Sequence, residues 1–345
     1  MNRFVQLHLL TSYPPANLNR DDLGQPKTAR LGGVERLRIS SQSLKRAWRT
    51  SDVFKQALGG AIGIRTRRMG VEAYESLIEA GVIEKNAVEW AKKITSVYGA
   101  AKKENPLEIE QLVHVSPEEL KSLDDLTVSL ANEDRAPLKG ELDALLHAQT
   151  AVDIAMFGRM LAKKPEHNTE AAVQVAHAIG VHASPIEDDY FTAVDDLNRD
   201  NETGAGHIGE RGFAAAVFYQ YICVDRESLK KNLGNDETLT SRALRALTEA
   251  ALKVAPTGKQ NSFASRAYAH FALAEKGSQQ PRSLALAFLK PVSGKDYATE
   301  ATSALLRLRE NMDKVYGRCA DREIRMDVMK GEGSVAELLD FAAGE

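Results

Sequence analysis

The first residues of the chain alternate between apolar and polar side chains. In residues 4–10 Val5, Leu7 and Leu9 fall on one face, and Gln6 and His8 are among the residues on the other. A period of two is typical of a β-strand. Residues 213–224 are almost wholly apolar and include aromatic and β-branched residues, which favours a central strand buried on both faces. Residues 267–274 resemble another strand.

Helical spacing dominates much of the remaining chain. A helix is expected over about residues 42–58, because apolar residues recur there at spacings of three, seven and four, while Lys45 and Arg49 stack on an exposed face. Ser40 and Ser41 supply hydroxyls that can cap its start. Further helical patterns occupy residues 59–181, 238–254 and, with short interruptions, 299–341.

Two segments lack a regular pattern and are rich in turn-forming residues. Residues 11–36 combine Pro and Gly with polar neighbours, which predicts a long surface loop of the kind that is usually functional or disordered. Residues 185–212 contain acidic pairs and three glycines between Gly204 and Gly209. That composition predicts a protruding loop or hairpin.

The composition is that of an ordinary soluble globular protein. The 345 residues are 43% hydrophobic and 27% charged, and they would fill about two average domains. The longest apolar run, Phe213 to Tyr219, is far shorter than the roughly 20 residues of a membrane-spanning helix. Cys223 and Cys319 cannot form a disulfide framework or a four-thiolate zinc site, which favours a reducing compartment.

Motifs for catalysis or cofactor binding are weak. Residues 204–209 spell G-x-G-x-x-G, but a dinucleotide loop follows a strand and opens a helix, whereas polar residues precede this segment and a strand pattern follows it. His177 and His182 are five residues apart, so they do not lie on one helical face as a pair of metal ligands. We therefore expect no cofactor, no metal site and no catalytic residue.

Positive charge is concentrated near the start of the chain, although the net charge is only −3. Residues 17–68 contain twelve Lys or Arg and four Asp or Glu, a net charge of +8, whereas the rest of the chain has 33 basic and 44 acidic residues, a net charge of −11. The cations lie on the expected loop and helix, and serines stand at the helix start, where unpaired amides and the helix dipole attract anions. This arrangement favours the binding of a polyanionic partner over the alternative that the charges only form a solvated surface.

Motifs in this basic segment resemble those of one protein family. Residues 17–22 (NLNRDD), Gly32-Gly33 and residues 38–47 (RISSQSLKRA) have the order and spacing found in the CasC-type backbone subunit of the type I-E CRISPR Cascade complex. The likeness extends over most of the chain, except for about residues 59–150. Further matching segments are residues 152–155, 158–160, 176–179, 191–197, 207–209, 217–219 and 258–260.

The resemblance implies an α+β fold shaped like a hand. Its RNA-recognition-motif-like (ferredoxin-like) palm is expected in residues 1–58 and 213–345, a helical fingers insertion in residues 59–184, and a projecting thumb hairpin in residues 185–212. Copies of the family's subunit assemble head to tail along one CRISPR guide RNA, which the thumb kinks at regular intervals before it pairs with target DNA.

The resemblance also implies partners and site residues. The partners are the guide RNA, target DNA through the guide, copies of the chain and other Cascade subunits, in the cytoplasm, without a membrane and without enzymatic activity. Because only 6% of the residues are aromatic, sequence-independent binding must depend chiefly on phosphate contacts. The residues implied at the guide backbone are Arg20, Lys27, Arg38, Ser40, Ser41, Gln42, Lys45, Arg46, Arg49, Lys259 and Gln260. Those implied at the kink and thumb are Met160, Tyr190, Phe191, Thr192, Val194 and Ile208.

Two other functional classes remain open. Related type III backbone subunits are RNA-guided ribonucleases in which a loop aspartate supports metal-dependent cleavage, and the candidates here are Asp21, Asp22, Asp195 and Asp196. The third class is a soluble structural protein that binds no nucleic acid.

Overall fold

The computed structural model describes residues 2–147, 151–193 and 207–344. The chain forms two compact units, each assembled from separate stretches of sequence. The first unit contains Met1–Phe54, Val175–Val224 and Leu244–Glu345. The second unit contains Lys55–Gln174 and Asp225–Ala243. The chain therefore leaves the first unit and returns to it twice.

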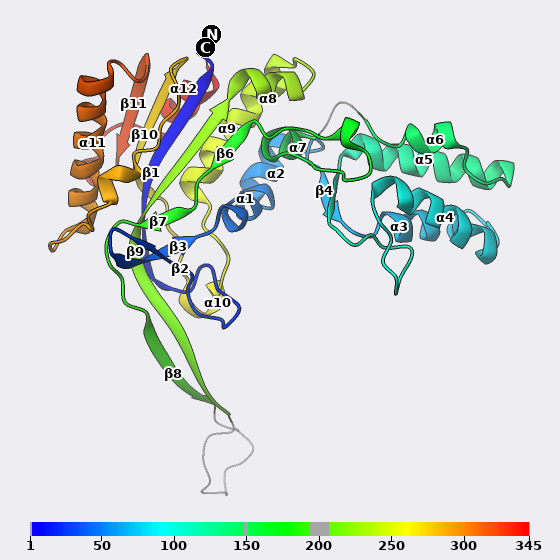
Figure 1. The fold of residues 1–345 in the computed structure, drawn as a ribbon, viewed down its shortest axis with the longest axis horizontal. Helices are drawn as coiled ribbons and strands as arrows, with labels where there is room; N and C mark the ends of the chain where they lie inside the picture. Colours follow the sequence, from blue (N-terminus) through cyan, green and yellow to red (C-terminus); the bar gives the residue numbers. More distant parts are fainter. Residues whose placement is uncertain (1, 148–150, 194–206, 345) are drawn as a thin grey trace, which may run out of the picture. The chain divides into compact units, whose positions relative to one another are not determined.

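One large sheet organises the first unit (Figure 1). Its main strands are β1 (Phe4–Ala16), β2 (Thr28–Leu31), β3 (Val34–Ile39), β7 (Ala178–Gly180), β9 (His207–Asp225), β10 (Ala269–Gly277) and β11 (Arg322–Asp327). They follow the order β11-β10-β1-β9-β7-β3-β2. The pairs β1–β10, β10–β11, β7–β9, β3–β7 and β2–β3 are antiparallel. Helices accompany this antiparallel sheet, which confirms the predicted α+β class.

Helix α11 (Tyr297–Tyr316) lies beside β10 and β11 in Figure 1 and covers one face of the sheet. Its buried Ala301 and Leu305 belong to the same apolar cluster as Phe271 and Leu273 of β10. Burying a side chain of leucine or phenylalanine size contributes about 1.5–3 kcal/mol, so this cluster holds the helix on the sheet. A short 3-10 helix, η2 (Ala285–Phe288), joins the cluster through Phe288, and α12 (Val335–Ala343) closes the chain.

The polar residues of β1 lie inside the first unit. The alternation in residues 4–10 correctly predicts the strand, but Gln6 and His8 are both buried. The Tyr221 hydroxyl donates a hydrogen bond of 2.8 Å to the Gln6 side chain. The His8 ring lies between the Tyr219 hydroxyl at 2.9 Å and the Glu275 carboxylate at 3.2 Å. These partners thus satisfy both buried side chains.

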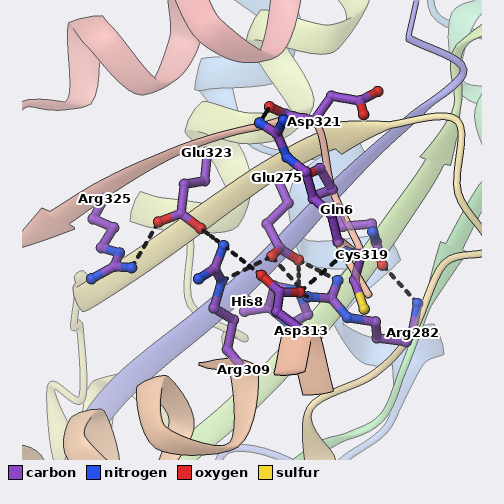
Figure 2. A network of polar contacts seen from close by, with 12 residues as sticks. Gln6, His8, Glu275, Arg282, Arg309, Asp313, Cys319, Asp321, Glu323 and Arg325 are labelled. Atoms are coloured by element: carbon purple, nitrogen blue, oxygen red, sulfur yellow. Dashed lines mark hydrogen bonds and ion pairs between the residues drawn. The ribbon is translucent and has the colours of Figure 1, made fainter. Parts of the chain in front are cut away.

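Figure 2 shows the network that surrounds Glu275. This buried carboxylate accepts hydrogen bonds of 2.6 and 2.9 Å from Arg282 and lies 3.6 Å from Arg309 of α11. Arg309 also contacts Glu323 of β11 at 2.5 Å. Burial alone would raise the pKa of Glu275, but hydrogen bonds from His8 and Arg282 outweigh it and hold the pKa at about 2. The network therefore ties the helix to three strands through charged groups.

Half of the segment predicted as a loop over residues 11–36 is β-structure. β1 continues to Ala16, and β2 and β3 form a hairpin closed by the pair Leu31–Val34. The turn consists of Gly32 and Gly33, whose φ angles of +63° and +84° are left-handed. Glycine adopts such angles without strain, and two of them match the twist of a tight hairpin. The glycines therefore form a hairpin turn, and the loop is limited to residues 17–27.

The helix predicted over residues 42–58 is divided in two. α1 (Ser41–Arg49) ends before α2 (Asp52–Leu58) begins. The Ser51 hydroxyl accepts a hydrogen bond of 3.2 Å from the backbone N–H of Phe54, which is the arrangement of a new helix start. The helical pattern at 299–341 is also interrupted, because β11 pairs with β10 along its whole length. Hydrogen bonding to the distant strand β10 there outweighs the helical spacing of the apolar residues.

The second unit is mainly helical, as the pattern of residues 59–181 predicts. Its helices are α3 (Met69–Glu79), α4 (Glu84–Tyr98), α5 (Pro117–Glu133), α6 (Lys139–Asp143), α7 (Val152–Phe157), α8 (Arg226–Asn232) and the 3-10 helix η1 (Pro165–His167). Strands β4 (Ile64–Thr66) and β5 (Val113–Val115) form a separate pair. Helix α9 (Glu237–Lys253) and β6 (Val173–Val175) contribute residues to both units. None of the helices in the described ranges is long and apolar enough to cross a membrane.

A hairpin extends beyond the rest of the sheet in Figure 1. β8 (Glu187–Ala193) pairs antiparallel with the first part of β9, so that Tyr190 lies opposite Glu210 and Thr192 opposite Ile208. This is the hairpin that the composition of residues 185–212 predicts. Three of the predicted residues, Val194, Asp195 and Asp196, lie outside the described residues.

Candidate nucleic-acid interface

A polar cavity of about 450 Å³ is lined by three segments of the first unit. The loop after β1 contributes Leu18, Asn19, Arg20, Asp21, Asp22 and Gly24, helix α1 contributes Ser43, Arg46, Ala47 and Thr50, and the segment after α9 contributes Thr257 and Gly258. Segments more than 200 residues apart in sequence thus form one site, which we call the loop pocket. It contains two of the predicted guide-binding residues, Arg20 and Arg46.

Two asparagines hold the loop in place. The buried Asn17 side chain donates hydrogen bonds of 2.9 Å to the carbonyl oxygens of Gly24 and Gly212, the latter in β9. The Asn19 carboxamide oxygen accepts a 2.8 Å hydrogen bond from the backbone N–H of Ser40. The loop is therefore fixed both to the sheet and to the start of α1.

Asp21 shapes the tip of the loop. One of its carboxylate oxygens accepts hydrogen bonds of 2.9 Å from the backbone N–H groups of Leu23 and Gln25. Asp residues favour turns in this way, because the side chain replaces a backbone acceptor. Half of this carboxylate is therefore committed to the turn, whereas the neighbouring Asp22 is exposed on the pocket wall.

Gly258 allows the third segment to approach the loop. A Cβ atom at this position would lie 2.2 Å from the carbonyl oxygen of Leu18, so only glycine fits. The next residue, Lys259, has a left-handed φ of 52° and precedes the short helix α10 (Gln260–Phe263). The Gln260 side chain donates a hydrogen bond of 3.3 Å to the carbonyl oxygen of Pro256. Lys259 and Gln260 thus directly follow the pocket wall in sequence.

Helix α1 presents its cations unequally. Ser40 caps the helix by accepting a hydrogen bond from the Ser43 N–H at 3.3 Å, as the sequence predicts. Lys45 and Arg49, predicted on an exposed face, are half-buried, and burial lowers the pKa of Lys45. Arg46 is exposed and lines the loop pocket. The helix therefore offers Arg46 most directly to a ligand.

A second, shallow hollow contains Lys27 and Arg38. Leu18 and Asn19 line both this hollow and the loop pocket, so the two adjoin along the loop. The Arg38 guanidinium donates hydrogen bonds of 2.8 Å to Nδ1 of His177 and 3.3 Å to the carbonyl oxygen of Thr28. Arg38 is thus oriented by two acceptors.

His177 is the residue of this surface that sequence reasoning missed. Its spacing from His182 argues against a metal pair, but its contact with Arg38 joins residues 139 positions apart. Burial, followed by the positive charges of Arg38 and Lys27, lowers the pKa of His177. Its only advance signal is its place in the family-like segment 176–179.

The predicted apolar residues are exposed on two elements. Tyr190 and Ile208 are 60% and 58% exposed on the β8–β9 hairpin. Phe191 is half-buried, with its ring against Gly209 and the Arg211 guanidinium 4.3 Å above the ring centroid. The hairpin therefore exposes two apolar side chains, Tyr190 and Ile208, while the Phe191 ring of β8 packs against β9.

Met160 belongs to the second unit and is 76% exposed. The preceding Arg159 is buried and donates to both carboxylate oxygens of Glu119, at 2.7 and 2.8 Å. It also contacts the carbonyl oxygens of His114 and His167. An exposed methionine is therefore attached to a rigidly held backbone.

Acidic and other metal-ligating side chains are scattered over the described residues. The described ranges hold no cluster of three or more His, Cys, Asp or Glu suited to a metal ion. Asp21 and Asp22 lie at the loop pocket, while the other two candidate aspartates of the ribonuclease hypothesis fall outside the described residues.

Comparison with known proteins agrees with this architecture. A family model described as "CT1975-like protein" matches residues 5–341. The chain belongs to the CT1975-like family. Among solved structures, a chain of a "CRISPR RNA-guided surveillance complex, pre-nicking" is 29% identical with a TM-score of 0.84, and a chain of a "CRISPR RNA-guided surveillance complex" is 26% identical with a TM-score of 0.73. No curated protein matches.

Both structural matches cover 99% of this CT1975-like chain and 99% of the matched chain. The likeness therefore includes residues 59–150, where the sequence alone shows little resemblance. The chain is similar over its whole length to subunits of CRISPR surveillance complexes.

Proposed function

We propose that this protein is the repeated, non-catalytic backbone subunit of a Cascade complex, of the CasC type found in type I-E systems, and that it holds the guide RNA by its phosphates. The single observation that carries this proposal is the loop pocket, which brings the 17–24 loop with Arg20, helix α1 with Arg46 and the 257–258 segment into one site. Each of the three segments overlaps a stretch that resembles the CasC-type family, namely residues 17–22, 38–47 and 258–260.

The charges of the site suit phosphate binding. Arg20 and Arg46 form no ion pair with another described residue, so their charges remain available to a ligand. Lys27 and Arg38 extend the cationic surface along the adjoining hollow. Contacts of this kind fix position without reading bases, which a subunit serving any guide requires.

The exposed apolar residues suit a kink in the guide. Tyr190 and Ile208 project from a hairpin, and Met160 from a braced segment. Apolar side chains that insert between nucleotides unstack them at a cost of a few kcal/mol, which backbone contacts offset. Successive copies, bound head to tail, would kink the guide at regular intervals and present the segments between kinks to target DNA, alongside other Cascade subunits.

The proposal predicts a specific loss of RNA binding. Arg20→Ala combined with Arg46→Ala removes two cations from the loop pocket, so affinity for single-stranded RNA falls and the salt slope flattens by about 0.7 for each phosphate that the protein no longer neutralises. Titration of RNA at several salt concentrations measures both effects. Arg307→Ala, which removes an exposed cation of α11 outside the pocket, is the matched control and leaves the slope unchanged.

Two outcomes contradict the proposal. Protein produced with guide RNA elutes from gel filtration with ribonuclease-sensitive absorbance at 260 nm; a monomeric, RNA-free protein refutes the function. The assembled complex leaves complementary RNA intact in magnesium. Regularly spaced cuts that disappear in Asp22→Ala would establish the ribonuclease alternative.

A further inference from the structure

The loop pocket contains carboxylates that a phosphate-binding site does not need. Asp21 and Asp22 line the same cavity as Arg20 and Arg46. None of these four side chains forms an ion pair with another residue of the described ranges. An unneutralised carboxylate repels a phosphate, so Asp22 weakens the proposed grip unless it contacts a hydrogen-bond donor of the same ligand.

Nucleic acids offer few donors to a carboxylate, which can only accept hydrogen bonds. Base edges carry N–H groups, but a subunit that serves any guide sequence cannot depend on them. The ribose 2′-hydroxyl is a donor at every nucleotide of RNA, and DNA lacks it. Elimination therefore leaves the 2′-hydroxyl as the donor that suits Asp22.

Of the two aspartates of the pocket, Asp22 is the one whose carboxylate accepts no hydrogen bond from another described residue. One carboxylate oxygen of Asp21 already accepts hydrogen bonds from the backbone N–H groups of Leu23 and Gln25. The Asn19 carboxamide oxygen accepts one from the backbone N–H of Ser40. Asp22 is exposed on the pocket wall, directly after Arg20 and Asp21 in a turn that these bonds hold. A cavity of about 450 Å³ is within the range that accepts a small-molecule-sized ligand, such as a single nucleotide.

We propose that Asp22 accepts a hydrogen bond from the ribose 2′-hydroxyl of a guide nucleotide whose phosphate contacts Arg20 and Arg46, and that the loop pocket thereby selects RNA over DNA. This inference rests on the proposed guide-binding function. The cations supply affinity for any nucleic-acid backbone, and the carboxylate supplies the preference for ribose.

The test is a cycle of one protein change and one ligand change. The full chain, wild-type or Asp22→Ala, is titrated with a single-stranded RNA and with the DNA of the same sequence. Hydrogen bonds to charged groups are strong enough that the ratio of RNA to DNA affinity falls about tenfold in Asp22→Ala. The DNA affinity rises or stays unchanged, because a repulsive charge has been removed.

Controls separate this inference from general damage. Glu310→Ala removes an exposed carboxylate of α11 and keeps the wild-type ratio. Asp22→Asn retains an acceptor oxygen and preserves part of the preference. If Asp22→Ala does not fold, RNA with 2′-O-methyl groups tests the same contact on the wild-type chain and binds about as weakly as DNA.

The contrary outcomes are distinct. A wild-type chain that binds RNA and DNA equally, or an Asp22→Ala chain with an unchanged ratio, overturns the role of Asp22 but leaves the phosphate grip intact. A wild-type chain that binds neither nucleic acid refutes the proposed function itself. Magnesium-dependent cleavage that requires Asp22 would make it a metal ligand and also overturn the inference.

Discussion

At the scale of single residues, Gly258 allows the 257–258 segment to pack against the loop and so to form one wall of the loop pocket. Replacing it with Ala places a Cβ atom 2.2 Å from the Leu18 carbonyl oxygen, and backbone must move to relieve the overlap. We expect a loss of about 1–3 kcal/mol in unfolding free energy, typical of overpacking, and weaker RNA binding. Urea unfolding and RNA titration measure the two effects. Gly140→Ala in α6, where no atom lies within 4 Å, is the matched control and is neutral or stabilising.

The contact between Arg38 and His177 gives a second test at this scale. Burial lowers the pKa of His177 first, and the Arg38 charge lowers it further. Arg38→Ala is therefore expected to raise that pKa toward the ordinary value of about 6.5. An NMR titration of the imidazole signals follows it directly, with Arg46→Ala as a control that leaves it unmoved. A pKa unaffected by Arg38→Ala would show that the 2.8 Å hydrogen bond does not persist in solution.

At the scale of elements, the buried ion pair of the second unit holds α5 to the segment before Met160. Glu119 caps α5 through Ser116 and also binds Arg159. Arg159→Ala leaves the carboxylate buried without its partner, which costs about 3–5 kcal/mol. Chemical unfolding measures the loss. Arg68→Ala removes the exposed partner of Glu72 and Glu75 and changes stability by less than about 1 kcal/mol. Equal effects from both variants would contradict a structural role for Arg159.

At the scale of the whole molecule, the network of Figure 2 makes stability depend on pH. Burial lowers the pKa of His8, and the pKa of Glu275 is held at about 2. Both folded-state values lie below the unfolded ones, so the stabilisation is present at neutral pH and is lost as pH falls. The His8 contribution declines below about 6.5, and that of Glu275 declines from about 4.5 towards 2.

Urea unfolding at a series of pH values follows both stages. Glu275→Gln is expected to reduce the lower stage and to destabilise the protein at neutral pH, because Arg282 and Arg309 lose their buried counter-charge. Glu310→Gln on the exposed side of α11 leaves the profile unchanged. A wild-type profile flat between pH 4.5 and 2 would contradict the role assigned to Glu275.

Local patterns in the sequence determined much of the secondary structure. The alternation of residues 4–10, the apolar run at 213–224 and the helical spacing of 59–181 each correspond to the element they predict. These signals are short-range, because strand and helix periods reflect neighbours a few residues apart. The concentration of positive charge in residues 17–68 is also visible without a structure.

Tertiary structure decided which of these elements meet. It placed Gly258 against Leu18 and His177 against Arg38, and it buried Gln6 and His8 of a strand whose pattern alone does not reveal their partners. It also turned Gly32-Gly33 from an expected loop into a hairpin turn. Such contacts depend on the packing and strand pairing of segments up to about 270 residues apart, which no local period encodes. The sequence therefore reveals cations such as Arg20 and Arg46, but only the tertiary structure brings them together with Gly258 around one pocket.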